Sequence, residues 1–239
     1  MTKTRLILAG DSTLRNGAGN GQWGWGDCLG PYFDAVRIEV INRAMGGRSS
    51  RTFISGGNWE EALALVRSGD FVFIQFGHND AGPINDDSRA RGTLPGIGEE
   101  WETIDNLLTG QRETVYSFGH YLRQYVRDTR TRDATPVLLS PVPRKQFGAD
   151  GRILRNEGGY GFWTWQIAQA GDAPFIRLNE LSADALDEIV RAMGPEALDE
   201  YFCGDHTHSS RKGAELNAAM TVRGIGELER CSLNSYLRN

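Results

Sequence analysis

The stretch Arg5-Leu6-Ile7-Leu8-Ala9-Gly10-Asp11-Ser12-Thr13 decides the fold of this chain. Its first half is a continuous apolar run, which is typical of a strand that helices cover on both faces. Its second half is polar and follows without a spacer, so we expect Ser12 at the carboxyl end of that strand. Similar apolar runs recur along the chain, separated by stretches with helical periodicity, and this alternation predicts an open parallel sheet.

The recurring runs predict the elements of one α/β domain over residues 1–239. Strands are expected over Arg5–Ala9, Ile38–Asn42, Phe71–Phe76, Pro136–Ser140 and Phe175–Leu178. Helices are expected near Gly26–Phe33, Trp59–Ser68, Arg112–Arg132, Gly159–Ala170, Ala183–Met193 and Ser210–Glu229. The predicted architecture is a three-layer α/β/α sandwich around a five-stranded parallel sheet. The long segment Ala81–Gly110 is polar and rich in glycine, which is typical of a lid or binding loop.

Three unusual turns follow the first three predicted strands. Gly10-Asp11-Ser12-Thr13 follows the first, Gly46-Gly47-Arg48 the second and Gly77-His78-Asn79-Asp80 the third. Ligands of open α/β sheets bind beyond the carboxyl ends of the strands. Because all three turns fall on that edge, the sequence predicts an active site there.

Two of the four histidines stand in Asp205-His206-Thr207-His208-Ser209. A carboxylate three residues before a histidine can accept its Nδ1–H, which leaves Nε2 to take a proton from a nucleophile. We therefore expect Ser12 to be the nucleophile, His208 the base and Asp205 the group that orients the base. His206 lacks this spacing and is expected either to line the site or to form a local hydrogen bond.

Acyl transfer also needs donors for the oxyanion that develops on the substrate. We expect these donors to be the backbone N–H groups of Ser12 and Gly47 and the side-chain amide of Asn79. A glycine at position 47 allows the backbone to approach a substrate without a Cβ in the way. No Gly-x-Ser-x-Gly motif occurs, so the usual nucleophile elbow of α/β-hydrolases is not expected.

Together these blocks resemble, in the same order, the four blocks of the SGNH (GDSL-type) hydrolases. The likeness is closer still to the rhamnogalacturonan acetylesterase branch, carbohydrate esterase family 12. Segments similar to that branch are Trp23-Gly24-Trp25-Gly26, Ile104-Asp105-Asn106-Leu107-Leu108-Thr109-Gly110 and Ser140-Pro141-Val142-Pro143-Arg144-Lys145. The resemblance runs from Leu6 to about Leu228. It implies a flavodoxin-like fold, the triad and oxyanion hole above, and no metal or organic cofactor.

The resemblance also implies a substrate. We expect a serine esterase that removes acetyl groups from rhamnogalacturonan fragments through an acetyl-enzyme. Trp23 and Trp25 are candidates for a wall of the sugar site, and Arg48 for a contact with galacturonate carboxylates. His78 is expected to make a structural hydrogen bond rather than transfer a proton, and with His206 it is a further candidate for substrate contact.

Four alternatives stay open beside this substrate. One is acetylated xylan or another acetylated oligosaccharide, and the second is a small lipid or thioester, which the polar, glycine-rich segment Gly82–Glu102 disfavours. The third is a carbohydrate-binding relative that has lost its chemistry, which the intact triad disfavours. The fourth is a phosphate-binding flavodoxin-like protein. It ranks last, because the stretch Gly17-Ala18-Gly19-Asn20-Gly21 comes too late after the first strand to cradle a phosphate.

Composition narrows the partners. The net charge of −5 argues against nucleic-acid binding. No apolar stretch approaches the roughly 20 residues that span a bilayer, and no signal peptide precedes Ser12, so a cytoplasmic protein is expected; export with a removed signal is the alternative. Three cysteines are too few for a disulfide scaffold, although one Cys203–Cys231 bridge is conceivable, and none has metal-site spacing.

Overall fold

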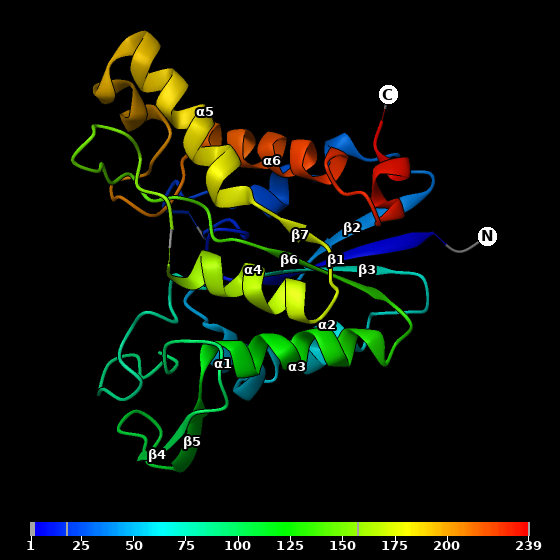
Figure 1. Ribbon diagram of the computed structural model, residues 1–239, viewed down its shortest axis with the longest axis vertical. Coiled ribbons are helices and arrows are strands. Elements are labelled where there is room, and N and C mark those ends of the chain that lie inside the picture. Colours follow the sequence, from blue (N-terminus) through cyan, green and yellow to red (C-terminus); the bar gives the residue numbers. More distant parts are fainter. Residues whose placement is uncertain (1–2, 18, 157, 239) are drawn as a thin grey trace.

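The computed structural model describes residues 3–17, 19–156 and 158–238, so Ala18 of the glycine-rich stretch lies outside it (Figure 1). Its centre is a parallel sheet of five strands in the order β2-β1-β3-β6-β7. The strands are β1 (Thr4–Gly10), β2 (Ile38–Asn42), β3 (Phe71–Gln75), β6 (Thr135–Leu139) and β7 (Phe175–Ile176). This is the order of flavodoxin-like sheets. The predicted fold class is confirmed.

Alternate residues of β1 face opposite layers, as the period of a strand requires. Ile7 and Ala9 belong to the cluster that packs under one set of helices, whereas Leu6 and Leu8 belong to the cluster on the other face. The first face is covered by α1 (Ser50–Ser55), α2 (Asn58–Leu63), α3 (Phe118–Arg130) and α4 (Tyr160–Ala170). The second is covered by α6 (Arg211–Gly226) and the 3-10 turns η1 (Trp25–Cys28), η2 (Gly30–Tyr32) and η4 (Ser232–Tyr236).

The helix α5 (Leu178–Met193) leans away from the sheet. It packs against α6 and against the 3-10 helix η3 (Pro195–Glu200), which shares a small separate core with it (Figure 1). The loop from η3 to α6 carries Asp205 and His208. The sequence predicts Ser209 or Ser210 as the N-cap of α6, and Ser210 takes this position by accepting a hydrogen bond from Gly213 N.

The structure corrects the sequence-based prediction most strongly between residues 81 and 132. Arg112–Arg132 was expected to be helical throughout, but its first part is the strand β5 (Arg112–Tyr116), and α3 begins only after Ser117. The expected irregular segment Ala81–Gly110 contains β4 (Trp101–Asp105), which pairs antiparallel with β5. These two strands form an arm that projects from the body of the molecule (Figure 1). Ile104 and Val115 are buried on its inner face, and this burial selects strand over helix.

Smaller corrections concern helix ends. The stretch Gly26–Phe33 forms two 3-10 turns, because Pro31 removes a backbone donor. The helix expected over Trp59–Ser68 ends at Leu63, and α5 starts earlier than expected, directly after β7. None of the helices in the described part of the chain combines the length and the apolar character needed to cross a bilayer.

Candidate active site

A chain of buried hydrogen bonds fixes the turn that carries Ser12 to the end of β3 and to Trp25. Asp11 Oδ1 accepts from the backbone N–H of Thr13 at 2.9 Å and from Thr13 Oγ1 at 2.8 Å. Gln75, the last residue of β3, donates from Nε2 to Thr13 Oγ1 at 2.7 Å, and its Oε1 accepts from Trp25 Nε1 at 2.9 Å. Asp11 thus forms the turn by accepting from the residue two positions on, whereas the contribution of Gln75 is not visible in the sequence.

Ser12 and the Asp205–His208 loop meet although they lie at opposite ends of the sequence. Ser12 Oγ is 3.1 Å from His208 Nε2, and His208 Nδ1 is 2.6 Å from Asp205 Oδ2. Asp205 Oδ1 also accepts from the backbone N–H groups of Thr207 and His208, both at 2.7 Å. The structure therefore brings the three residues of the predicted triad together within hydrogen-bonding distance, as activation of a serine by a histidine requires.

The Asp205 carboxylate is held in its ionised form. Partial burial acts to raise its pKa, but the hydrogen bonds from the His208 ring and from the two backbone N–H groups outweigh burial and lower the pKa to about 2. An ionised Asp205 fixes His208 in the tautomer with its proton on Nδ1. Nε2 then faces Ser12 as an acceptor, which is the arrangement that a general base needs.

The two other predicted turns lie beside Ser12. A Cβ built on Gly46 would lie 3.8 Å from Ser12 Cβ, so the glycine turn passes directly next to the serine. Gly47 has a φ of 76°, a conformation that favours glycine. Asn79 Nδ2 donates to Arg48 O at 2.8 Å, which fixes the amide and leaves its second N–H for a ligand. The Gly46 contact and the Asn79 hydrogen bond join these two turns to each other and to the turn of Ser12, and the oxyanion role of Ser12, Gly47 and Asn79 stays a prediction.

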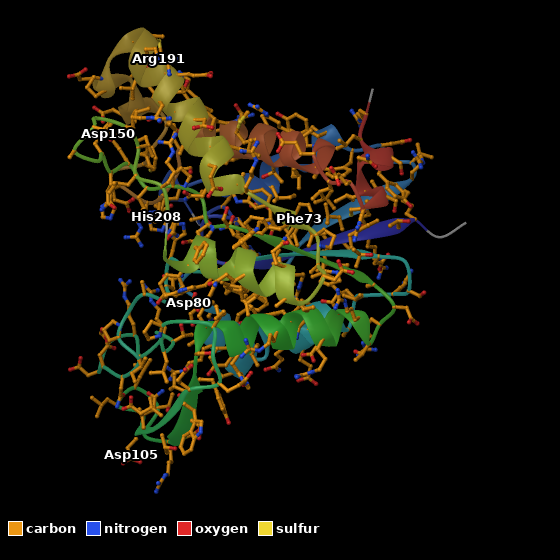
Figure 2. All side chains as sticks on the ribbon, viewed as in Figure 1. Phe73, Asp80, Asp105, Asp150, Arg191 and His208 are labelled. Carbon is orange, nitrogen blue, oxygen red and sulfur yellow. The ribbon has the colours of Figure 1, made fainter. Side chains whose placement is uncertain are left out.

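The carboxyl group of Asp80 differs from that of Asp205, because its pKa is raised whereas the pKa of Asp205 is lowered. It is fully buried, and its Oδ1 accepts from Ser50 N at 3.0 Å and from Ser50 Oγ at 2.5 Å. Burial raises the pKa of Asp80 to about 7, although both hydrogen bonds from Ser50 act to lower it. Asp80 accepts a backbone hydrogen bond from Gly77 in its own loop, and through Ser50 it also links that loop to the start of α1. In Figure 2, Asp80 and His208 lie at the same end of the sheet, away from the two chain termini.

The remaining candidate residues divide between a cavity and the surface. His78 Nδ1 lies 3.5 Å from Arg144 Nε, and burial lowers the pKa of His78, so its ring is held neutral. His206 is exposed, and its Nε2 lies 3.4 Å from Arg144 Nη1. Arg144 therefore bridges the two histidines. His78, Arg144, Gln146 and Asn156 line a cavity of about 290 Å³.

The tryptophans that follow the Ser12 turn, Trp23 and Trp25, differ in their exposure to solvent. Trp25 is 0% exposed in the core, so the prediction that it forms a wall of the sugar site is wrong. Its indole N–H needs a buried partner, and Gln75 supplies one. Trp23 is partly exposed, donates its backbone N–H to Ser209 O at 2.9 Å and lies under Arg211. Trp23 thereby links the N-terminal turn to the loop of His208 and stays a candidate for substrate contact.

The cysteines and Arg91 complete the surroundings of the site. Cys203 and Cys231 are both free, so the conceivable bridge between them is absent. Arg91 donates from Nη1 to Gly47 O at 2.9 Å and holds the glycine turn from the side of the long loop.

Comparison with known proteins gives consistent relatives. The GDSL-like lipase/acylhydrolase family matches residues 8–216. A probable rhamnogalacturonan acetylesterase of Bacillus subtilis is 33% identical over 229 residues, which cover 93% of either chain. A rhamnogalacturonan acetylesterase of Emericella nidulans is 27% identical over 220 residues, which cover 92% of this chain and 84% of that protein.

Solved structures agree on the fold. The crystal structure of protein YxiM of Bacillus subtilis matches with a TM-score of 0.74 at 26% identity; the match covers 95% of this chain and 57% of that one, so this chain spans little more than half of it. A catalytic mutant of the acetylxylan esterase Axe2 from Geobacillus stearothermophilus has a TM-score of 0.59 at 19% identity, over 94% of this chain and 96% of that one. At that identity the likeness concerns the fold alone.

Proposed function

Because this chain belongs to the GDSL-like lipase/acylhydrolase family and is a carboxylic ester hydrolase, we propose that it removes O-acetyl groups from plant cell-wall carbohydrate. In this proposal the substrate is acetylated rhamnogalacturonan fragments, the class that the names of two relatives state for those proteins. The observation that carries the proposal is the line of contacts from Ser12 Oγ through His208 to Asp205.

The reaction follows from that geometry. As Ser12 Oγ attacks the acetyl carbonyl carbon, His208 Nε2 takes the hydroxyl proton, and Asp205 stabilises the imidazolium that forms. The carbonyl oxygen becomes an oxyanion and accepts hydrogen bonds from the N–H groups of Ser12 and Gly47 and from Asn79. The bond to the sugar oxygen then breaks, and that oxygen takes the proton from His208. Water, deprotonated by His208, attacks the acetyl-enzyme and releases acetate and free Ser12.

The surroundings of the triad support a polar substrate. The cavity of about 290 Å³ that begins at the Gly77-His78 turn offers donors from Arg144, Gln146 and Asn156. Carbohydrate hydroxyls need such placed polar groups, whereas an acyl chain needs an apolar surface. The larger and more apolar hollows lie elsewhere, one between α3 and α4 and the other on the far side of α4.

The experiment that tests the proposal measures acetate release from three substrates. These are acetylated rhamnogalacturonan oligosaccharides, acetylated xylo-oligosaccharides and a small aryl acetate. We expect the highest kcat/KM on the rhamnogalacturonan oligosaccharides, and Ser12→Ala should lower kcat on every substrate by roughly 10⁴–10⁶-fold. Ser68→Ala, which changes an exposed serine outside the site, is the matched control and should leave all three rates unchanged.

Each outcome decides one part of the proposal. Activity on the aryl acetate alone would retain the triad and reject the carbohydrate substrate. A preference for xylan fragments would retain the acetylesterase and replace its substrate. Full activity of Ser12→Ala would reject the nucleophile itself.

A further inference from the structure

A basic pocket lies between α1 and the arm formed by β4 and β5. It has a volume of about 330 Å³ and is lined from three segments that are distant in the sequence: the turn and helix around α1, the loop before the arm, and the arm itself. Its charged lining residues are Arg48, Arg51, Arg89, Arg112 and Glu113. Four guanidinium groups and one carboxylate therefore share a small space in a protein whose net charge is −5.

The carboxylate among these charged lining residues, that of Glu113, is already paired with Arg51. Glu113 accepts from Arg51 Nε at 2.7 Å and from Arg51 Nη2 at 2.5 Å, and this pair is bidentate. Within the described part of the chain, the other guanidinium groups form no ion pair with a carboxylate; they are those of Arg48, Arg89 and Arg112. Three like charges in one pocket repel one another, so an anion that enters it is stabilised.

Two neighbouring carboxylates do not fill this role. Asp86 Oδ1 accepts from the backbone N–H groups of Ser88, Arg89 and Ala90 and so caps its own loop. Asp105 faces Arg112 across the β4–β5 ladder, but the two side chains form no ion pair. Neither carboxylate lines the pocket.

Arg48 links the pocket to the turns of the proposed active site. The backbone of Arg48 follows Gly47, whose N–H is a proposed oxyanion donor, and Arg48 O accepts from Asn79. The side chain of Arg48 turns the other way, into the basic pocket. One residue thus contacts the oxyanion hole with its carbonyl and the pocket with its guanidinium group.

We propose that this basic pocket binds a uronate carboxylate of the sugar chain whose acetyl group lies at Ser12. The proposal rests on the proposed function and deepens it, because it assigns the acidity of the substrate to particular residues. A guanidinium group matches the two oxygens of a carboxylate, and the three groups come from three separate segments that line this one pocket. Ser55 and Gln111 also line the pocket and offer partners for sugar hydroxyls. A neutral acetylated chain has no carboxylate, so the basic pocket adds no affinity for it.

The test uses the double variant Arg89→Gln/Arg112→Gln, which removes two positive charges from the pocket and leaves Arg48 and the triad in place. The matched control is Arg132→Gln/Arg191→Gln, which removes the same charge from exposed sites without ion pairs among the described residues. Arg191 lies at the opposite end of the molecule from Asp105, which marks the arm in Figure 2. The measured quantity is the ratio of kcat/KM for acetylated rhamnogalacturonan oligosaccharides to kcat/KM for acetylated xylo-oligosaccharides.

We expect this ratio to fall about 10–100-fold in the pocket variant, through KM on the acidic substrate, because charge-assisted hydrogen bonds are lost. The control variant should keep the wild-type ratio. An unchanged ratio in the pocket variant would overturn the inference even if the enzyme deacetylates both substrates. If the wild type releases acetate from neither carbohydrate, the proposed function fails, and binding then decides the inference separately.

Binding is measured by calorimetry with the full chain. The probes are de-acetylated rhamnogalacturonan oligosaccharides and the same oligosaccharides with their carboxyl groups reduced to alcohols. We expect the acidic probe to bind, the reduced probe to bind about 10-fold or more weakly, and the pocket variant to lose this difference. Equal binding of both probes would overturn the inference. Displacement of the acidic probe by equimolar inorganic phosphate or sulfate would also overturn it, because the pocket would then accept any small anion.

Discussion

The carboxyl end of the parallel sheet and the β4–β5 arm meet at α1, but different forces hold them. The turns of Ser12 and Asn79 continue strands whose side chains are buried on both faces, and a buried network ending at Gln75 locks the first of these turns. The arm is attached through the buried side chains of Ile104 and Val115 and through one buried guanidinium group. Arg51 is 1% exposed; besides Glu113 it binds Ile84 O at 2.8 Å and Gly92 O at 2.9 Å.

This difference separates two tasks. Catalysis requires atoms to be fixed within fractions of an ångström, and the sheet edge supplies that rigidity. Recognition of a long substrate depends on a surface that can change without disturbing the sheet, and the arm, with a solvent-exposed outer face, is such a surface. Substitutions at the sheet edge should therefore act on kcat, whereas substitutions in the arm should act on KM or on local stability.

The largest effect is expected at the sheet edge, from Asp205→Asn. This change keeps the shape of the side chain but removes the charge that fixes the tautomer of His208, so kcat should fall about 10⁴-fold on both aryl acetate and carbohydrate. The measurement is steady-state hydrolysis of the aryl acetate, with Asp172→Asn, a carboxylate 92% exposed, as control. A loss of less than tenfold would show that Asp205 does not orient His208.

The next largest effect is expected where the arm joins the body, from Arg51→Met. The substitution strands Glu113 and two backbone carbonyls, so the free energy of unfolding should fall by roughly 2–4 kcal/mol. Urea denaturation measures this loss, and limited proteolysis should show faster cleavage between residues 84 and 116.

The matched control for Arg51→Met is Arg43→Met. It breaks the surface pair with Glu61, whose side chains are 36% and 65% exposed, and should cost less than about 1 kcal/mol. Equal losses in the two variants would mean that Arg51 does not hold the arm.

The same contrast explains how far the sequence predicts the structure. The five strands were predicted to within two residues at each end, because short continuous apolar runs bounded by turn residues are typical of strands buried on both faces. The three turns then fall on one edge by topology alone, and the Asp205–His208 spacing adds the base. Fold class and the grouping of the proposed triad therefore follow from local pattern and sheet geometry.

The arm could not be predicted in this way. Arg112–Tyr116 has one buried face only and runs directly into α3, so its short alternation is lost in the longer helical pattern. One signal was available, because Ser117 is the N-cap of α3 and accepts from His120 N. Gln75 and Arg51 give no such signal. Their roles depend on partners more than 30 positions away in the sequence.

A third prediction uses pH to examine the sheet edge. The pKa of Asp80 is about 7 in the folded protein against an ordinary value of 3.8, so the folded state keeps a proton that the unfolded state has already lost. The contribution of Asp80 to the free energy of unfolding should therefore be greatest at or below about pH 4. This contribution should fall as the pH rises to about 7, by up to about 1.4 kcal/mol per pH unit.

The variant Asp80→Asn isolates this contribution. Asparagine keeps the oxygen that accepts from Ser50 but cannot ionise, so the difference in unfolding free energy between variant and wild type should grow in favour of the variant from pH 5 to pH 7. Asp205 stays ionised throughout this window because its pKa is about 2, and it does not contribute to the slope. A constant difference across the window would show that Asp80 does not titrate between the two states.

The smallest effect is expected on the outer face of the arm, from Trp101→Ser. Trp101 is 63% exposed, so its removal should change the free energy of unfolding by no more than about 0.5 kcal/mol. Val115 on the inner face is 0% exposed, and Val115→Ala should cost about 1–3 kcal/mol in the same urea denaturation. A one-sided arm can present its outer face to a substrate without loss of stability. If Trp101→Ser were as destabilising as Val115→Ala, and the loss grew with protein concentration, the outer face would be covered by a second copy of the chain.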